Sequence, residues 1–412
     1  MRVLVSAYGC EPDLGSEPGV GWNWTKQIAL IASEVTVLTR STNAALIAGA
    51  ADRPTNVTYV YIDLPRWWRK LFKRPGRGSQ PYYLLWQALA AMKAYRLHRE
   101  HPFDLAHHLT WATMTMPAGV AILPVPFVLG PVGGGVRTCW PLWRDFGARG
   151  LVYEIGRTCL QRLALINPMV WLTWRRATVV LTQNPDTAKV MRRRVRGRVY
   201  VCSNVGISRS EVLVSRDAPK VNSVDPIEVV FVGRLVHWKG TVTALRAVAL
   251  GPKGSVHLSI IGAGVDKRRC LRLARRLQVE GSVDFCGSMS RSDVLKQLDR
   301  ADVLLFPSQH DEGGFVVIEA MARGVRPVVL DLGGPPTLVG NVGVIVPHNP
   351  AGDVAARLAQ AILQASRADP GPVIERASEF DWNTKRRYIE LAYGMALRAI
   401  SRRRFGRVDE PI

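Results

Sequence analysis

The chain has 412 residues, of which 47% are hydrophobic and 21% are charged. This length is too great for one ordinary hydrophobic core and suits two domains of about 200 residues each. The composition is that of an ordinary globular protein, which argues against a disordered chain. Lys and Arg number 55 against 33 Asp and Glu, which gives a formal net charge of +22. Such an excess favours an anionic partner, and phosphorylated small molecules, acidic lipids and nucleic acid all qualify.

Short β-rich runs alternate with helical patterns through residues 1–207, the first predicted domain. Apolar residues at helical spacing predict helices over 22–32 and 82–98. Strands separated by helices imply a parallel sheet that is covered on both faces. We expect these strands at residues 2–7, 35–39, 57–62, 104–107, 127–129, 178–182 and 198–202.

Residues 109–136 carry no charge and are numerous enough to span a membrane. Four prolines interrupt this segment and three glycines end it, and a spanning helix with so many breaks would leave backbone groups unsatisfied in lipid. We expect a buried helix, a short strand and a glycine loop.

The first residues of the chain predict a strand and not a signal peptide. The six cysteines contain no C-x-x-C pair. We therefore expect a cytoplasmic protein with reduced thiols.

Residues 208–226 are polar and are predicted to form a linker. The second predicted domain, 227–380, repeats the alternation, with helices over 241–250, 271–277 and 315–323. The tail from 353 to about 402 has a helical pattern, and 381–412 are predicted to form a helix that packs back on the first domain. The strands of the second predicted domain are expected at 227–232, 256–261, 283–285, 303–306, 328–330 and 343–346. The fold class is therefore α/β, with two Rossmann-like domains that face a central cleft.

The sharpest motif is D-E-G-G-F-V-V-I-E-A, residues 311–320, which follows a predicted strand. The glycines Gly313 and Gly314 let the backbone approach a ligand, and the helix that begins at Phe315 offers free N–H groups to a phosphate. Asp311 lies just before this helix and Glu319 one turn into it. Carboxylates at these places suit paired sugar hydroxyls, whereas in isolation they are equally consistent with surface charges.

A second motif, G-R-L-V-H-W-K-G at 233–240, follows the first strand of the second domain. Arg234 and Lys239 lie on a loop that begins with Gly233. Two cations at this spacing suit a diphosphate, because Arg binds it bidentately and Lys acts as a point charge. They would also stabilise a departing nucleoside diphosphate.

The patterns F-V-G-R-L-x-x-x-K-G, I-I-G-A-G and D-x7-E occur in this order between residues 227 and 347. Together they resemble the retaining glycosyltransferases of the GT-B fold, in the large fourth carbohydrate-active family. The resemblance implies that Arg234 and Lys239 grip the donor diphosphate, that Glu319 binds the nucleotide ribose and that the acid at 311 contacts the transferred sugar. The family usually has Glu at the first acidic position; Asp311 stands here and Glu312 is its neighbour, and the eight-residue offset favours Asp311.

The same resemblance implies that the loops at 262–264, with Gly262 and Gly264, and at 285–289 border the nucleotide base. No metal is expected, because the two cations take its place. We therefore expect no cofactor, and a nucleotide-sugar donor as substrate.

The first domain resembles the family less closely. Residues 15–24 resemble the glycine-rich loop after the first strand, where Gly19 and Gly21 allow close approach to donor phosphate or acceptor. The family commonly has a histidine at the end of the strand that here holds His107 and His108. Alternation puts these two on opposite sides of the strand, and His108 is the one favoured for the sugar site. The glycine loop at 130–135 is expected on the acceptor side.

Residues 64–78 interleave six basic residues with two tryptophans, Leu71 and Phe72. This chemistry suits an anionic membrane surface, with rings at headgroup depth and cations on lipid phosphate. Nucleic acid could use the same residues, but no nucleic-acid motif accompanies them. A peripheral position at the inner membrane face is thus a hypothesis, alongside a plain solvated surface.

The leading function is transfer of a hexose-type sugar from a UDP- or GDP-sugar to a glycan or lipid-linked acceptor, with retention of configuration. The alternatives are a nucleotide-sugar epimerase of the same fold and a non-catalytic sugar- or lipid-binding relative. A phosphorylase would need a cofactor lysine site, which is not found. A dehydrogenase is disfavoured because G-A-G at 262 lacks the rest of the dinucleotide fingerprint.

Overall fold

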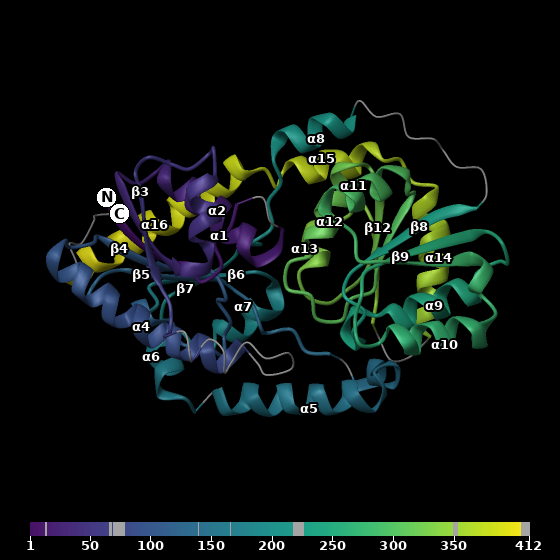
Figure 1. Cartoon of the computed structure of the whole chain (residues 1–412), viewed down its shortest axis with the longest axis horizontal. Coiled ribbons are helices and arrows are strands. Elements are labelled where there is room, and N and C mark those ends of the chain that lie inside the picture. Colours follow the sequence, from purple (N-terminus) through teal and green to yellow (C-terminus); the bar gives the residue numbers. More distant parts are fainter. Residues whose placement is uncertain are drawn as a thin grey trace, which may run out of the picture. The chain divides into compact units, whose positions relative to one another are not determined.

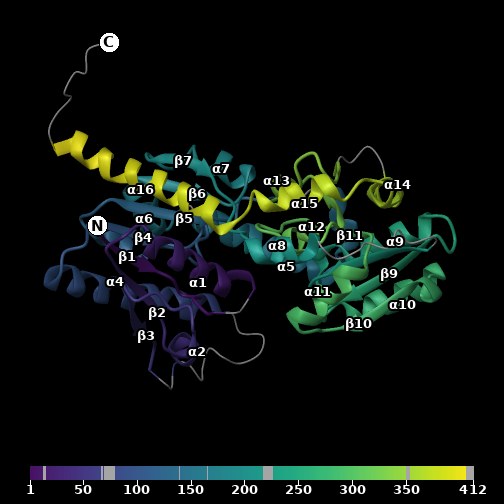
Figure 2. The same ribbon diagram turned by 90° about the horizontal axis from the view of Figure 1, so that it is seen from above.

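The computed structural model describes residues 1–12, 15–65, 68, 79–138, 140–164, 166–216, 226–348 and 353–404. The chain forms two compact units (Figure 1 and Figure 2). Unit 1 comprises Met1–Gly135, Cys159–Asn204 and Trp382–Ile412, and unit 2 comprises Val136–Thr158 and Val205–Asp381.

Unit 1 is built on a seven-stranded parallel sheet of order β3-β2-β1-β4-β5-β6-β7. The order reverses between β1 and β4, so this point is a topological switch, where ligands of such sheets bind. The strands are β1 (Arg2–Ser6), β2 (Glu34–Arg40), β3 (Val57–Ile62), β4 (Leu105–His108), β5 (Phe127–Val132), β6 (Val179–Thr182) and β7 (Arg198–Val201).

Helices cover both faces of this sheet. The long helix α16 contacts α1, β4, β5 and β6 on one face, while α4 and α6 both contact the short helix η2 on the other. In Figure 2, α16 (yellow) lies along the strands β5 and β6. The helices are α1 (Ser16–Ala29), α2 (Ala44–Gly49), α4 (Ser79–Glu100), α6 (Pro168–Arg176), α7 (Pro185–Met191), α16 (Trp382–Arg404) and the 3-10 helices η1 (Ser41–Asn43) and η2 (Gly119–Ile122).

Unit 2 has a six-stranded parallel sheet of order β10-β9-β8-β11-β12-β13. The order reverses between β8 and β11, which are neighbours at the centre of the sheet. The strands are β8 (Ile227–Val232), β9 (Val256–Ile261), β10 (Val283–Gly287), β11 (Val303–Phe306), β12 (Arg326–Leu330) and β13 (Val344–Val346).

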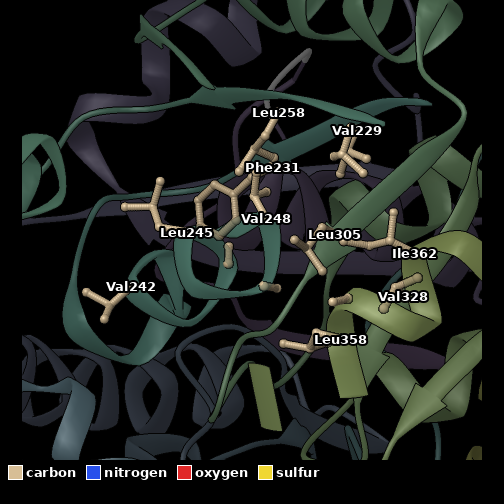
Figure 3. Close-up of a cluster of buried hydrophobic side chains, with 14 of the residues drawn as sticks. Val229, Phe231, Val242, Leu245, Val248, Leu258, Leu305, Val328, Leu358 and Ile362 are labelled. Atoms are coloured by element: carbon tan, nitrogen blue, oxygen red, sulfur yellow. The ribbon is translucent and has the colours of Figure 1, made fainter. Parts of the chain in front are cut away.

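Alternate residues of these strands pack into two cores. Phe231 and Leu305 belong to the cluster under α9, α10 and α14 (Figure 3), whereas Val230 and Leu304 belong to the cluster under α11, α12, α13 and α15. This alternation is the two-residue period of a strand buried on both faces. The helices are α8 (Arg209–Arg216), α9 (Thr241–Leu250), α10 (Lys267–Leu277), α11 (Arg291–Arg300), α12 (Phe315–Ala322), α13 (Pro335–Val339), α14 (Val354–Ser366), α15 (Gly371–Ser378) and the 3-10 helices η3 (Trp140–Asp145), η4 (His237–Lys239) and η5 (Glu280–Ser282).

Helix α5 (Gly147–Ala164) is shared, because its residues up to Thr158 group with unit 2 and the rest with unit 1. The sequence placed all of residues 1–207 in the first domain, so residues 136–158 differ from that division. The predicted linker 208–226 also differs, since α8 occupies its first part and contacts α12 and α15. Residues 217–225 lie outside the described part.

The predicted buried helix after residue 109 is wrong. In its place the chain bends and forms only the 3-10 helix η2. Prolines at 117 and 124 prevent a regular helix here. The backbone is instead satisfied by side chains: Thr173 Oγ1 accepts from the Ala118 N–H at 3.0 Å and Gln87 Oε1 accepts from the Gly119 N–H at 2.8 Å.

No helix within the described ranges is long and apolar enough to cross a membrane. Most of the basic segment 64–78 lies outside the described residues, which include only 64, 65 and 68 of it. The prediction of a membrane surface there stays a prediction.

Candidate functional site

The two predicted motifs of unit 2 meet at the switch point of its sheet. One follows β8 and the other follows the neighbouring strand β11. The Lys239 ammonium forms an ion pair with the Asp311 carboxylate, and both side chains keep less than a fifth of their surface exposed. The Lys239 ammonium also lies 5.1 Å from the centre of the Phe306 ring. A cation and an acid thus stand together where such sheets bind ligands.

The loop that follows the neighbouring strand β12 holds the Asp311 backbone in place. The Gly334 N–H donates to the Asp311 carbonyl at 2.9 Å, and a Cβ on Gly333 would lie 2.2 Å from the same oxygen. Burial alone would raise the pKa of the Asp311 carboxyl, but the charge and hydrogen bond of Lys239 outweigh it, so that the pKa is lowered. Asp311 is therefore ionised at neutral pH, and it accepts hydrogen bonds without donating them.

The loop that carries the cations is held by the glycine loop after β9. The Gly233 N–H donates to the Ile261 carbonyl at 3.0 Å and the Leu235 N–H to the Ala263 carbonyl at 2.9 Å. A Cβ on Gly264 would lie 2.2 Å from the Leu235 carbonyl oxygen. The two loops pack backbone against backbone, which is a structural reason for these glycines besides the predicted approach of a base.

We expect Gly262→Ala to lower the free energy of unfolding by about 2 kcal/mol, because overpacking of this kind costs about 1–3 kcal/mol. Gly262 has a φ of 142°, and its Cβ would lie 2.0 Å from the Gly233 carbonyl oxygen. Urea unfolding measures the change, with Gly281→Ala as control, since a Cβ there meets nothing within 4 Å. Equal stability of the two variants would contradict the packing role.

Arg234 is exposed and its guanidinium lies 5.6 Å from the centre of the Trp238 ring. It makes no ion pair with any carboxylate of the described residues. Its charge is thus available to an anion, unlike that of Lys239. Within the same ranges, no group of three or more His, Cys, Asp or Glu side chains has the arrangement of a metal site.

Glu319 lies on α12, and its carboxylate is held by an arginine that the sequence analysis missed. The Arg291 Nε atom donates to Glu319 Oε1 at 2.8 Å, and the other arm of Arg291 donates to Glu211 at 2.7 Å. Burial raises the pKa of the Glu319 carboxyl, and the Arg291 charge acts against that rise. Arg291 orients the predicted ribose acceptor; no motif marked it, because it is a single basic residue at the start of α11.

Helix α12 begins at Phe315, as predicted, and Gly314 caps it with a φ of 84°. Gly313 and Gly314 are both buried, and Gly314 adopts the left-handed backbone that favours glycine. The N–H of Gly313 is hydrogen bonded to Asp311. The first turn of α12 therefore directly follows the acid of the Lys239 pair.

A buried carboxylate on α5 braces both loops of the site. Glu154 Oε1 accepts from His310 Nε2 at 3.0 Å and from His237 Nε2 at 3.3 Å. The Glu154 side chain is 2% exposed. Burial alone would raise its pKa, but the hydrogen bonds from the two histidines and the nearby Arg157 charge lower it to about 2. Because an ionised carboxylate only accepts, each histidine must carry a proton on Nε2.

Trp238 is stacked between two rings, at 5.1 Å from His310 and 5.0 Å from Tyr153. His310 directly precedes Asp311 and Trp238 directly precedes Lys239. The cluster of Glu154, His237, His310, Trp238 and Tyr153, which we term the α5 brace, therefore fixes the neighbours of both site residues. No local pattern in the sequence predicts this cluster, because helix α5 itself was not expected from the sequence.

In unit 1, His107 and His108 lie on opposite faces of β4, as strand alternation predicts. The Nε2–H of His107 donates to the Gly130 carbonyl at 2.7 Å, so that Nδ1 accepts from the Tyr393 hydroxyl at 2.8 Å. His108 lies 3.0 Å from the Tyr83 hydroxyl and 3.1 Å from the Ser6 hydroxyl. Both rings are buried with both nitrogens bonded, so that a sugar could reach His108 only by displacing a partner.

We expect the free energy of unfolding to fall as the pH drops below about 6.5. Burial lowers the pKa of His107 to about 4 and that of His108 to about 3, whereas both titrate near 6.5 in the unfolded chain. Between these values the unfolded state binds more protons, so stability is complete above pH 6.5 and is lost toward pH 4. Urea midpoints at pH 7.5, 6.5 and 5.5 measure this, and a smaller fall is expected in His108→Gln. A midpoint that does not change with pH would contradict it.

Gly19 and Gly21 lie within α1, which begins at Ser16 and not at the predicted residue 22. A Cβ on Gly21 would lie 1.9 Å from the Gly9 carbonyl oxygen, so this glycine lets α1 pack on the loop after β1. The nearby Glu17 carboxylate accepts from the Trp111 N–H. Burial raises the pKa of the Glu17 carboxyl.

Residues 215–377 match the model of the family described as glycosyl transferases group 1. The putative colanic acid biosynthesis glycosyltransferase WcaL of Escherichia coli (strain K12) is 35% identical over 188 residues, which are 42% of this chain and 46% of WcaL. The chain thus matches less than half the length of that relative.

Two solved structures are similar over nearly the whole chain. Sucrose-phosphate synthase from Thermosynechococcus elongatus has a TM-score of 0.65 at 19% identity, and the match covers 97% of this chain and 99% of that chain. Anabaena Alr3699/HepE in complex with UDP and glucose has a TM-score of 0.57 at 17% identity, covering 96% and 99%.

The chain has two parallel sheets, each with helices on both faces, and it is similar to sucrose-phosphate synthase over nearly its whole length. These two findings define a protein of the GT-B fold. The expected fold is confirmed. The residues that match the model of the glycosyl transferases group 1 family all lie in unit 2.

Proposed function

We propose that the protein is a retaining glycosyltransferase that moves a hexose-type sugar from a nucleotide-diphosphate sugar, UDP- or GDP-linked, to a glycan or lipid-linked acceptor. The product belongs to cell-surface polysaccharide or glycolipid synthesis. The observation that carries the proposal is the meeting of Lys239 and Asp311 at the switch point between β8 and β11.

Each site residue has a role that its chemistry suits. Lys239 and the exposed Arg234 take the diphosphate and stabilise the charge that develops on it as the sugar leaves. Glu319, oriented by Arg291, accepts the ribose hydroxyls. Asp311, ionised at neutral pH, accepts a hydroxyl of the transferred sugar. The reaction requires no metal in this proposal, because the two cations neutralise the leaving group.

The donor class is supported by the relatives. The structure of Anabaena Alr3699/HepE holds UDP and glucose, and WcaL is described as a glycosyltransferase of colanic acid biosynthesis. The glycine loop 262–264 packs against the cation loop, which is consistent with a nucleotide base bordering it. From the interleaved basic and aromatic residues of segment 64–78 we also propose a cytoplasmic site of action at the inner membrane face, with this segment on anionic lipid.

The experiment is a panel of UDP-, GDP- and ADP-sugars, measured by calorimetry for binding and by nucleotide release for turnover. We expect one nucleotide class to bind, and release to rise when an oligosaccharide acceptor is added. Product configuration, read by NMR of the anomeric proton, tests retention. Turnover of donor that is independent of any acceptor would favour the epimerase, and absence of binding by every sugar would remove the donor site.

A further inference from the structure

Unit 1 contains a groove that no predicted motif explains. It has a volume of about 390 Å³ and lies where β5, β6 and β7 begin, with part of α16 beside them. The glycine motifs of unit 1 follow strands, at the opposite, carboxyl edge of the same sheet. The groove is therefore separate from the loops assigned to donor and acceptor, and the inference below does not rest on the proposed function.

Five arginines from three distant segments converge on this groove. Two end α6, two lie at the start of β7 and one lies on α16. No acidic residue lines the groove. They are Arg175, Arg176, Arg196, Arg198 and Arg398, and none forms an ion pair with a carboxylate in the described part of the chain. Such a concentration of like charge repels itself and creates a strong local field for anions.

Three of the arginines have contacts that fix their place. The Arg175 guanidinium lies 4.3 Å from the centre of the Trp171 ring. Arg176 donates through Nε to the Ala121 carbonyl at 3.2 Å and through a second nitrogen to the Leu123 carbonyl, and Arg198 lies 3.9 Å from the Met395 sulfur. None of these contacts neutralises a charge. Since a guanidinium has five N–H donors, most donors remain for a ligand.

Arg196 and Arg398 are exposed and make no hydrogen bond or ion pair to other described side chains. Their positive charges repel the neighbouring arginines, which lowers the stability of unit 1, and no carboxylate within its described residues offsets this repulsion. This pattern differs from that of Arg291 or Arg157, whose guanidiniums are each bound to a carboxylate.

We propose that the groove is a second binding site, for a phosphate-bearing anion. Planar guanidiniums bind phosphate bidentately, and the volume is that of a small-molecule site. The phosphate belongs either to a free phosphorylated molecule or to a lipid headgroup. The exposed ring of Trp171, which the groove residue Arg175 contacts, offers an apolar surface for the rest of such a ligand.

The test compares two double variants of the full chain. Arg196→Gln with Arg398→Gln removes two charges inside the groove. Arg193→Gln with Arg194→Gln removes two exposed charges that do not line it. None of the four side chains forms a hydrogen bond or an ion pair with another described residue, so both variants should unfold at nearly the same urea concentration as the parent.

Two probes distinguish the sources of phosphate. Inorganic pyrophosphate is titrated at constant ionic strength, and vesicles of phosphatidylcholine with or without phosphatidic acid are sedimented with the protein. We expect the groove variant to bind at least one probe about 10-fold more weakly or worse, with less than a twofold change in the control. Loss for pyrophosphate indicates a free ligand, and loss for phosphatidic acid vesicles only indicates a headgroup. Equal weakening in both variants, or no weakening in either, would overturn the proposal.

Discussion

Lys239→Ala should lower donor turnover by about 10²-fold or more, the loss typical of removing one group that stabilises transition-state charge. The ammonium of Lys239 is already placed beside the acid of the site, so its removal takes away a positioned charge and not a mobile surface cation. Nucleotide release with the donor selected from the panel measures the effect. Lys239→Arg keeps the charge but not the compact shape, and it should recover only part of the activity.

The matched control for this variant is Lys253→Ala, which removes an exposed lysine from the same unit. We expect its turnover to stay within twofold of the parent. Urea unfolding of both variants separates lost chemistry from lost structure, because Lys239→Ala also leaves the Asp311 carboxylate without its cation. The assignment of the phosphate grip is falsified if Lys239→Ala turns over donor within threefold of the parent.

Glu154→Ala should lower the free energy of unfolding by about 3 kcal/mol, since each buried N–H left without an acceptor costs about 1–3 kcal/mol. Two such groups depend on one Glu154 oxygen, from His237 and His310, and their side chains are 7% and 8% exposed. Glu154→Gln keeps an acceptor oxygen and should lose much less. Urea unfolding followed by circular dichroism gives both values.

Glu280→Ala is the control, because this carboxylate is exposed in the same unit. We expect a change within about 0.5 kcal/mol, as for most surface substitutions. The α5 brace also predicts a functional effect: Glu154→Ala should weaken donor binding even where the variant is folded, since it releases the residues beside Lys239 and Asp311. Parent-like stability in Glu154→Ala would show that the brace does not hold the two loops.

The strands and the two motif loops could be predicted from the sequence, because both depend on local pattern. Apolar runs ended by glycine define β8 and β9, and the motif residues follow them. That Lys239 touches Asp311 required one further fact, the adjacency of β8 and β11, which depends on strand order and is invisible in a local pattern.

The residues that support the site could not be found in this way. Glu154 lies 83 residues from His237 and 156 from His310, so no spacing connects them. Arg291 is 28 residues from Glu319 and 80 from Glu211. The predicted helix after residue 109 failed for a related reason. Its backbone is satisfied by Gln87 and Thr173, partners from α4 and α6 that permit an irregular path through a buried layer.

The pair of Lys239 and Asp311 has a consequence for the order in which ligands can enter the proposed site. Lys239 and Asp311 already neutralise each other, so a neutral sugar has to compete with this ion pair for the Asp311 carboxylate. A diphosphate can exchange with the carboxylate for Lys239, because it offers negative charge in return. That exchange releases Asp311 to accept a sugar hydroxyl. Binding of the nucleotide part of the donor thus makes the Asp311 carboxylate available to the sugar. Free sugar should therefore bind only when a nucleoside diphosphate is present.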